Sequence, residues 1–154
     1  MSEKLVNKAL KIATDAHNGQ KRDGNHPYIE HPIRVAKKLQ GMSKIAGLLH
    51  DVIEDSPMTS KDLLNLGIPE VVVEAVVHLT KKNGENYYDF IMRICSSPLT
   101  EARQIALMVK LADIEDNMSD LKEGSLKDKY RLSKHILKET VSGAMDGGFW
   151  VFQN

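Results

Sequence analysis

Apolar residues recur every three or four positions along most of this chain, which is the spacing of one buried face of an α-helix. The first such stripe follows Ser2, a possible N-cap, and consists of Leu5, Ala9, Ile12, Ala13 and Ala16. A second helix is expected to begin near Glu30, because Pro32 suits a first helical turn. Between the two, residues 19–28 break the pattern with glycine, asparagine and aspartate, and we expect an ordered loop there.

The third stripe mixes apolar and ionisable residues. A helix is expected to begin near Ser43 and to end before Pro57, whose ring disfavours helical geometry in the preceding residue. Four ionisable residues lie within residues 46–56: His50, Asp51, Glu54 and Asp55. On one continuous helix His50 would lie a turn below Glu54, and Asp51 a turn below Asp55. Carrying unpaired charge into a core costs several kcal/mol, and metal coordination is one of the arrangements that offsets this cost.

The rest of the chain predicts further helices. The expected spans are 62–66, capped by Thr59 or Ser60, a stretch after Pro69 ending near Leu79, 87–95, a stretch from Thr100 past Asp113, and 126–141. In the stretch from Thr100 the apolar stripe is clearest, and Asp113 and Asn117 continue it one turn apart. We assign no structure to the tail from Gly143. With no strand-like alternation and no repeat, residues 1–154 are expected to form one all-α domain, a compact multi-helix bundle.

Composition narrows the function classes. Lys and Arg number 21, and Asp and Glu also 21, so no global charge favours nucleic acid or an anionic membrane. Cys95 is the only cysteine, which excludes an intrachain disulfide and a thiolate zinc site and suits a reducing compartment. The N-terminus lacks the apolar core of a signal peptide, and no apolar run has the length of a membrane span. We therefore expect a cytoplasmic protein with no nucleic-acid or membrane partner.

Two imidazoles and two carboxylates from three predicted helices form a candidate metal site. They are His31, His50, Asp51 and Asp113. This donor set suits Mn²⁺, Fe²⁺ or a similar ion better than structural zinc. By contrast, His17, His78 and His135 stand alone, and we expect them to be packed and hydrogen-bonded.

Glu54 and Asp55 follow the proposed ligands by one turn. Either they form a solvated helix end, or they orient a water and accept its proton beside a metal that lowers its pKa. The second interpretation is favoured, because the helix dipole disfavours acids at a C-terminus. In the loop, Lys21 and Arg22 are either surface charges or ligands, since the guanidinium of Arg22 can stack on a base or bind a phosphate. Spacing alone leaves this alternative open.

Five motifs make the chain resemble a known family. They are A-H-N-G-Q-K-R at 16–22, P-Y-I-E-H-P at 27–32, L-L-H-D-V-I-E-D at 48–55, L-T-K at 79–81, and K-L-A-D followed by N-M at 110–118. In this order they resemble the HD-domain metal-dependent phosphohydrolases, and more narrowly the hydrolase domain of RelA/SpoT-type alarmone enzymes. The resemblance implies an all-helical HD-domain bundle that removes the 3′-pyrophosphate of guanosine tetraphosphate or pentaphosphate. The 154 residues leave no room for the synthetase domain that often follows, so we expect a stand-alone hydrolase.

The resemblance also implies roles for individual residues. It places one Mn²⁺ ion on the four candidate ligands and gives Glu54 and Asp55 the activation of the attacking water. The expected substrate-binding residues are Lys21, Arg22, Tyr28 and Asn117, with Arg22 against the guanine base and Asn117 near the nucleotide sugar.

Several positions depart from the family pattern. After Arg22 the family usually has lysine, serine, glycine and glutamate, where this chain has Asp23, Gly24, Asn25 and His26. After Asp113 it usually has a basic residue and, two positions on, a histidine or tyrosine, where this chain has Ile114 and Asp116. Part of the positive charge expected around a pyrophosphate is therefore missing. Two alternatives stay open: the same chemistry on another nucleotide or phosphoester, and a nucleotide-sensing module without turnover.

Overall fold

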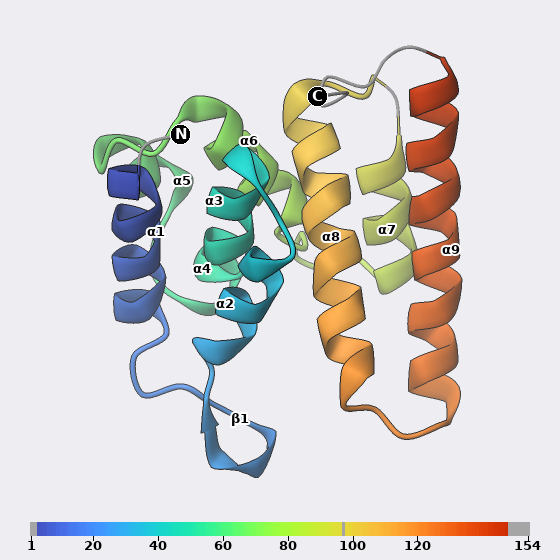
Figure 1. The fold of residues 1–154 in the computed structure, drawn as a ribbon, viewed down its shortest axis with the longest axis horizontal. Helices are drawn as coiled ribbons and strands as arrows, with labels where there is room; N and C mark the ends of the chain where they lie inside the picture. The colour runs from blue at the N-terminus through green and yellow to red at the C-terminus, as the bar shows by residue number, and fades with distance from the viewer. Residues whose placement is uncertain (1–2, 97, 148–154) are drawn as a thin grey trace.

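The chain folds into a bundle of α-helices in the computed structural model, which describes residues 3–96 and 98–147 (Figure 1). In order the helices are α1 (Glu3–Ala16), α2 (Glu30–Lys37), α3 (Gly41–Leu49), α4 (Val52–Asp55), α5 (Ser60–Asn65), α6 (Glu70–Leu79), α7 (Tyr87–Cys95), α8 (Glu101–Ser119) and α9 (Ser125–Asp146). The predicted all-α class is confirmed. Among the described residues no helix has both the length and the apolarity to cross a membrane.

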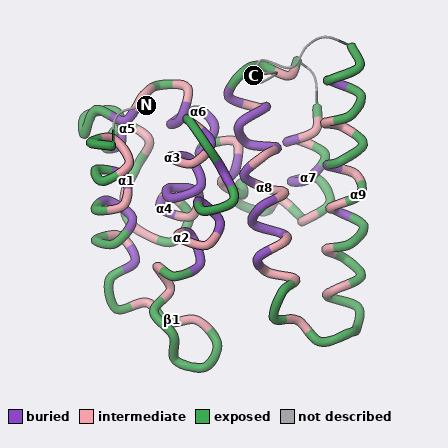
Figure 2. Tube along the Cα trace, viewed as in Figure 1, coloured by how far each residue is buried: buried purple, intermediate pink, exposed green. Residues whose placement is uncertain are grey.

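Helix α8 lies between two groups of helices. On one side it packs against α2, α3 and α6, and on the other against α7 and α9 (Figure 1). The largest fully buried side chains come from both groups and from α8 itself, and they include Ile45, Leu49, Ile94, Ile105, Leu107, Ile114 and Leu137. Buried positions line α3, α6 and α8, whereas the loop around β1 and much of α9 are exposed (Figure 2). The core therefore holds α2, α3 and α8 in fixed relative positions.

The predicted third helix is interrupted at its ionisable residues. The prediction of one continuous helix is wrong, because α3 ends at Leu49 and α4 begins only at Val52. At the break, the imidazole Nδ1 of His50 donates to the carbonyl of Gly47 at 2.7 Å, a group that would serve the amide of Asp51 in an unbroken helix. The interruption places His50 and Asp51 at the junction of two helices. As predicted, the helical segment stops before Pro57.

The other elements differ less from the boundaries that the sequence predicted. The loop after α1 contains a short antiparallel hairpin that the sequence did not predict, with β1 (Lys21–Arg22) and β2 (His26–Pro27) joined by a 3-10 turn at Asp23–Asn25. Asn25 has a positive φ of 66°, in the left-handed region that asparagine tolerates. The predicted cap at Thr59 is confirmed by a capping box with Asp62. Helix α9 extends past the predicted end at residue 141, while Ser2 and residues 148–154 lie outside the described part.

Candidate active site

His31, His50 and Asp51 meet where α2 approaches the junction between α3 and α4. One potential ligand atom from each of the three lies within 4.8 Å of the others. Asp51 Oδ2 is 3.0 Å from His50 Nε2 and 3.8 Å from His31 Nε2. The two imidazole rings meet edge to face, with their centroids 5.2 Å apart. Residues from two segments of the chain therefore point their ligand atoms at one small volume.

Asp113 joins this group from α8. Its Oδ1 lies 3.1 Å from His31 Nε2 and 3.8 Å from His50 Nε2. Its two oxygens also accept hydrogen bonds, Oδ2 from the ammonium of Lys110 at 2.8 Å and Oδ1 from the amide of Asn117 at 2.8 Å. Burial of the Asp113 carboxyl would raise its pKa, but the Lys110 charge outweighs this and lowers it. The carboxylate is therefore ionised and held in place.

Both histidines have the orientation that a metal ligand requires. His31 Nδ1 donates to Asp116 Oδ2 at 2.7 Å, and His50 Nδ1 donates to the Gly47 carbonyl at 2.7 Å. Hydrogen bonds of this kind fix the ring orientation and make Nε2 of each ring the nitrogen that can bind a metal. His50 Nε2 is buried and has no hydrogen-bond partner among the described residues, which is costly unless another group binds it. A cation at this point would satisfy it.

The charges at the site fit a divalent cation. Burial opposes ionisation of Asp51, but the His50 imidazolium outweighs it and holds the pKa of Asp51 at about 2. Burial likewise lowers the pKa of His50, while the charges of Asp51 and Asp113 raise it to about 9. Without a metal, a proton on His50 thus balances the carboxylates, and a cation would displace it. The donor set is two nitrogens and two carboxylates, and these chemical properties suit a divalent metal.

Tyr28 contacts a candidate ligand directly. Its hydroxyl donates to Asp51 Oδ2 at 2.6 Å, and its ring lies 5.9 Å from that of His31. The sequence placed Tyr28 among the substrate-binding residues. In the structure its hydroxyl is hydrogen-bonded to the Asp51 carboxylate, while burial and the Asp51 charge raise the pKa of the phenol.

Glu54 and Asp55 lie on α4, directly after the site, and both are exposed to solvent. Partial desolvation and the charge of Asp51 raise the pKa of each carboxyl, and Asp55 adds to the effect on Glu54. A carboxylate with a raised pKa is a better proton acceptor at neutral pH. The backbone carbonyl of Asp55 also accepts a hydrogen bond from Gln20 at 2.8 Å, which ties this turn to the loop after α1.

Asp116 has contacts in the site that the sequence did not predict. From the sequence it was interpreted only as a position where the expected histidine or tyrosine is missing. In the structure its carboxylate is buried and contacts His31, Arg34 and Arg22. Its neighbour Ile114 was interpreted as a position where the expected basic residue is missing, but it is fully buried in the core and has no access to a ligand. One signal in the sequence points to Asp116: it lies three residues after Asp113, on the same face of a helix.

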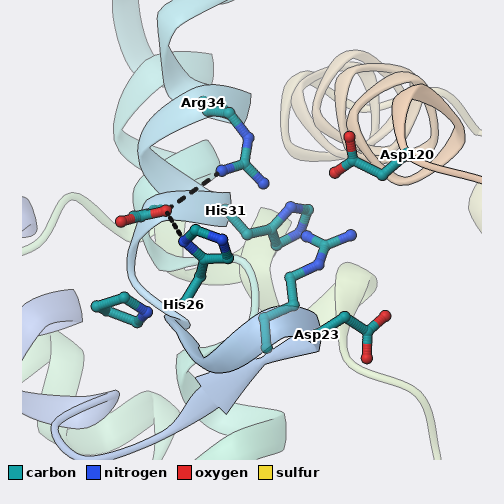
Figure 3. A pocket seen from close by; sticks show the side chains of 8 residues that line it. Asp23, His26, His31, Arg34 and Asp120 are labelled. Atoms are coloured by element: carbon teal, nitrogen blue, oxygen red, sulfur yellow. Dashed lines mark ion pairs between the residues drawn. The ribbon is translucent and has the colours of Figure 1, made fainter.

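The remaining substrate-binding candidates fall into two groups. Arg22 Nη2 donates to Asn117 Oδ1 at 2.7 Å, so the β1 strand contacts α8 at this point. Lys21 is exposed. A cavity of about 160 Å³ opens beside Arg22 and His31, and Figure 3 shows His31 and Arg34 facing Asp120 across it. Its lining is Arg22, Asp23, His26, Pro27, Glu30, His31, Arg34 and Asp120.

The remaining histidines have different environments. His17 is packed and its Nδ1 is 2.9 Å from Gln20 Oε1, as predicted. His78 is partly buried, with its Nε2 3.8 Å from Glu74. The expectation that His135 is packed is wrong, because it lies on the exposed face of α9.

Several known proteins are similar to this chain in sequence. A family model described as an HD domain matches residues 9–138. The bifunctional (p)ppGpp synthase/hydrolase SpoT of Escherichia coli K12 is 37% identical over 153 residues, covering 90% of this chain and 20% of that protein. The GTP pyrophosphokinase of Myxococcus xanthus is 32% identical over 152 residues, covering 86% of this chain and 19% of that protein. The chain therefore spans about a fifth of these curated relatives.

A solved structure has the same fold. It comes from work describing a metazoan ortholog of SpoT that hydrolyzes ppGpp and plays a role in starvation responses. The TM-score is 0.72 at 23% identity, over 93% of this chain and 88% of the other.

Proposed function

The chain belongs to the HD-domain family, and from this premise we propose that it is a metal-dependent phosphohydrolase that removes the 3′-pyrophosphate of guanosine tetraphosphate or pentaphosphate. One observation carries the proposal: the Nε2 atoms of two buried histidines converge with the carboxylates of Asp51 and Asp113. The substrate is suggested by relatives named for hydrolysis of this nucleotide, such as the guanosine-3′,5′-bis(diphosphate) 3′-pyrophosphohydrolase of Haemophilus influenzae, 35% identical over 84% of this chain and 20% of that protein.

Mn²⁺ is the metal that we propose. His31, His50, Asp51 and Asp113 would hold it, and mixed imidazole and carboxylate donors suit this ion. When bound, the metal would polarise the scissile phosphate and make water more acidic. Lys110 keeps Asp113 ionised, and Tyr28 orients Asp51 for this task.

The proton of the attacking water would pass to a carboxylate of α4. Glu54 is our first choice, since its carboxyl has a raised pKa and is exposed to solvent, so it can release the proton again. Asp55, next to it, would support the same step. Arg22 and Asn117, joined by a hydrogen bond, would contact the nucleoside, and Lys21 would supply a further positive charge.

A second candidate keeps the chemistry and changes the substrate. The cavity beside Arg22 is lined by three carboxylates, those of Asp23, Glu30 and Asp120, and by the guanidiniums of Arg22 and Arg34. Negative groups therefore outnumber the guanidiniums, which is unfavourable for a highly charged phosphate placed there. This observation favours a nucleotide or phosphoester with less charge on that side. A nucleotide-sensing module without turnover is the third possibility, and the presence of Glu54 and Asp55 directly after the site argues against it.

A substrate screen separates these possibilities. Purified Mn²⁺-loaded protein is incubated with guanosine tetraphosphate, guanosine triphosphate and guanosine monophosphate, and the products are separated by ion-exchange chromatography. We expect turnover of the tetraphosphate alone. Turnover of another nucleotide but not of the tetraphosphate would reject our substrate, and tight binding with no product would favour the sensing module.

The cytoplasm is the compartment that we propose. Cys95, the one cysteine of the chain, is a free thiol, and a guanine nucleotide substrate would be found in that compartment.

A further inference from the structure

The geometry points to Asp116 as a positioning residue that fixes His31 for metal binding and fastens α2 and the β1 loop to α8. This inference rests on the proposed function only in taking the site to bind a divalent metal. The side chain of Asp116 is not itself among the candidate ligands. It acts through the histidine that it contacts.

The contacts of Asp116 occupy both of its carboxylate oxygens. Oδ2 accepts from His31 Nδ1 at 2.7 Å and from Arg34 Nη2 at 3.0 Å, and Oδ1 accepts from Arg34 Nε at 2.8 Å. Arg22 Nη1 adds an ion-pair contact at 3.5 Å. The residue is 3% exposed, so these contacts are shielded from water. Charged hydrogen bonds of this kind are stronger and more directional than neutral ones.

Arg34 supplies the positive charge that stabilises the buried Asp116 carboxylate. A buried carboxylate with no counter-charge is strongly destabilising, and the paired guanidinium hydrogen bonds of Arg34 offset that effect. Arg34 lies three residues after His31, so both side chains leave the same face of α2 and reach the same carboxylate on α8. Asp116 therefore clamps α2 at two points, one of which is a candidate metal ligand.

Asp116 also contacts a residue that is proposed to bind the substrate. Arg22, proposed to contact the nucleoside, lies between Asp116 and Asn117, consecutive residues of α8. Helix α8 thus supplies a ligand (Asp113), the partner of another ligand (Asp116) and the anchor of the β1 loop (Asn117). Where the family pattern led us to expect a histidine or tyrosine, this chain has an acid that joins these parts.

The test measures Mn²⁺ affinity without any substrate. Dissociation constants are determined by titration calorimetry for the wild type, Asp116→Leu, Asp116→Asn, Arg34→Met and the control Asp128→Asn. Asp116→Leu should weaken binding about 10- to 100-fold, as removal of such partners does elsewhere. Asp116→Asn should weaken it less, because its amide oxygen still accepts from His31. Asp128→Asn removes an exposed acid on α9 and should bind like the wild type.

A second measurement follows His31 directly. In protein loaded with diamagnetic Zn²⁺, nitrogen-15 spectra should show a protected Nδ1–H on His31 and on His50. Asp116→Leu should lose the His31 signal and keep that of His50, a pattern that general destabilisation would not produce. If Asp116→Leu fails to fold, the Arg34→Met variant tests the inference in its place. This variant leaves Asp116 without its main counter-charge and should also weaken Mn²⁺ binding.

Two results would overturn the assignment. One is a folded Asp116→Leu protein that binds Mn²⁺ like the wild type, and the other is an unchanged His31 Nδ1–H in that variant. Neither depends on which nucleotide is hydrolysed. If the wild-type protein does not hydrolyse the alarmone, the proposed function is rejected, but the positioning role of Asp116 is unaffected.

Discussion

His50 is supported by the helix that directly precedes it, whereas His31 depends on a carboxylate 85 residues further along the chain. The partner of His50 is the backbone carbonyl of Gly47, three residues earlier. The partner of His31 is the side chain of Asp116 on α8. Both hydrogen bonds measure 2.7 Å, so the two rings are held equally closely by very different means.

The difference separates the site into a local half and an assembled half. His50 and Asp51 are placed by one helix junction, that of α3 and α4, and form the local half. His31, Asp113 and Asp116 come together only when α2 and α8 pack against each other. A substitution of a side chain can remove the support of His31 but not that of His50, because a backbone carbonyl is present in every residue.

The largest effect should come from the local half itself. Asp51→Ala removes a candidate ligand whose Oδ2 lies within 4 Å of both histidines, so bound metal and turnover should both be lost. Metal content by mass spectrometry and the rate of pyrophosphate release test this. Asp15→Ala, a change of an exposed acid on α1, is the matched control and should preserve both. A metal-loaded, active Asp51→Ala protein would remove Asp51 from the site.

Glu54→Gln separates metal holding from proton transfer. The amide keeps the shape of the side chain but cannot accept the proton, so kcat should fall about 10²- to 10⁴-fold. Metal content should stay at the wild-type level, because neither histidine contacts Glu54. Glu74→Gln on α6 is the control. Full activity in the Glu54→Gln protein would end the role assigned to this carboxylate.

Tyr28→Phe weakens the local half by a side-chain contact. It deletes the hydroxyl that donates to Asp51 Oδ2 at 2.6 Å and keeps the ring. Mn²⁺ affinity should fall about tenfold, the lower end of the effect seen for such partners. Calorimetric titration measures the change. An unaltered affinity would show that Asp51 needs no support from the loop, which would sharpen the contrast with His31.

Gly47→Ala tests the backbone support of His50 and should have the smallest effect. A Cβ at this position would come within 2.9 Å of Leu39 Cδ1. Because that atom ends a side chain that can shift, we expect a loss of about 1 kcal/mol in unfolding free energy. Urea denaturation measures it. Since the carbonyl remains, Mn²⁺ affinity should change little, and a large loss of affinity would contradict the description of His50 as locally secured.

The same contrast explains what could be predicted from the sequence. The His50-Asp51 pair and Asp113 were found because each interrupts a helical apolar stripe. The role of Asp116 could not be read, since its partners Arg34 and His31 are 82 and 85 residues away. The break after Leu49 was missed because it arises from a side chain capturing a backbone carbonyl. The β1–β2 hairpin was not predicted because two-residue strands are too short to show an alternation of apolar and polar residues.

The most direct test of the account is product analysis after Mn²⁺-loaded protein is incubated with guanosine tetraphosphate, with the Glu54→Gln protein in parallel. We predict guanosine diphosphate and pyrophosphate in equal amounts from the wild type, and neither above background from the variant. Unchanged tetraphosphate in the wild-type reaction, or release of phosphate from the 5′ side instead, would contradict it.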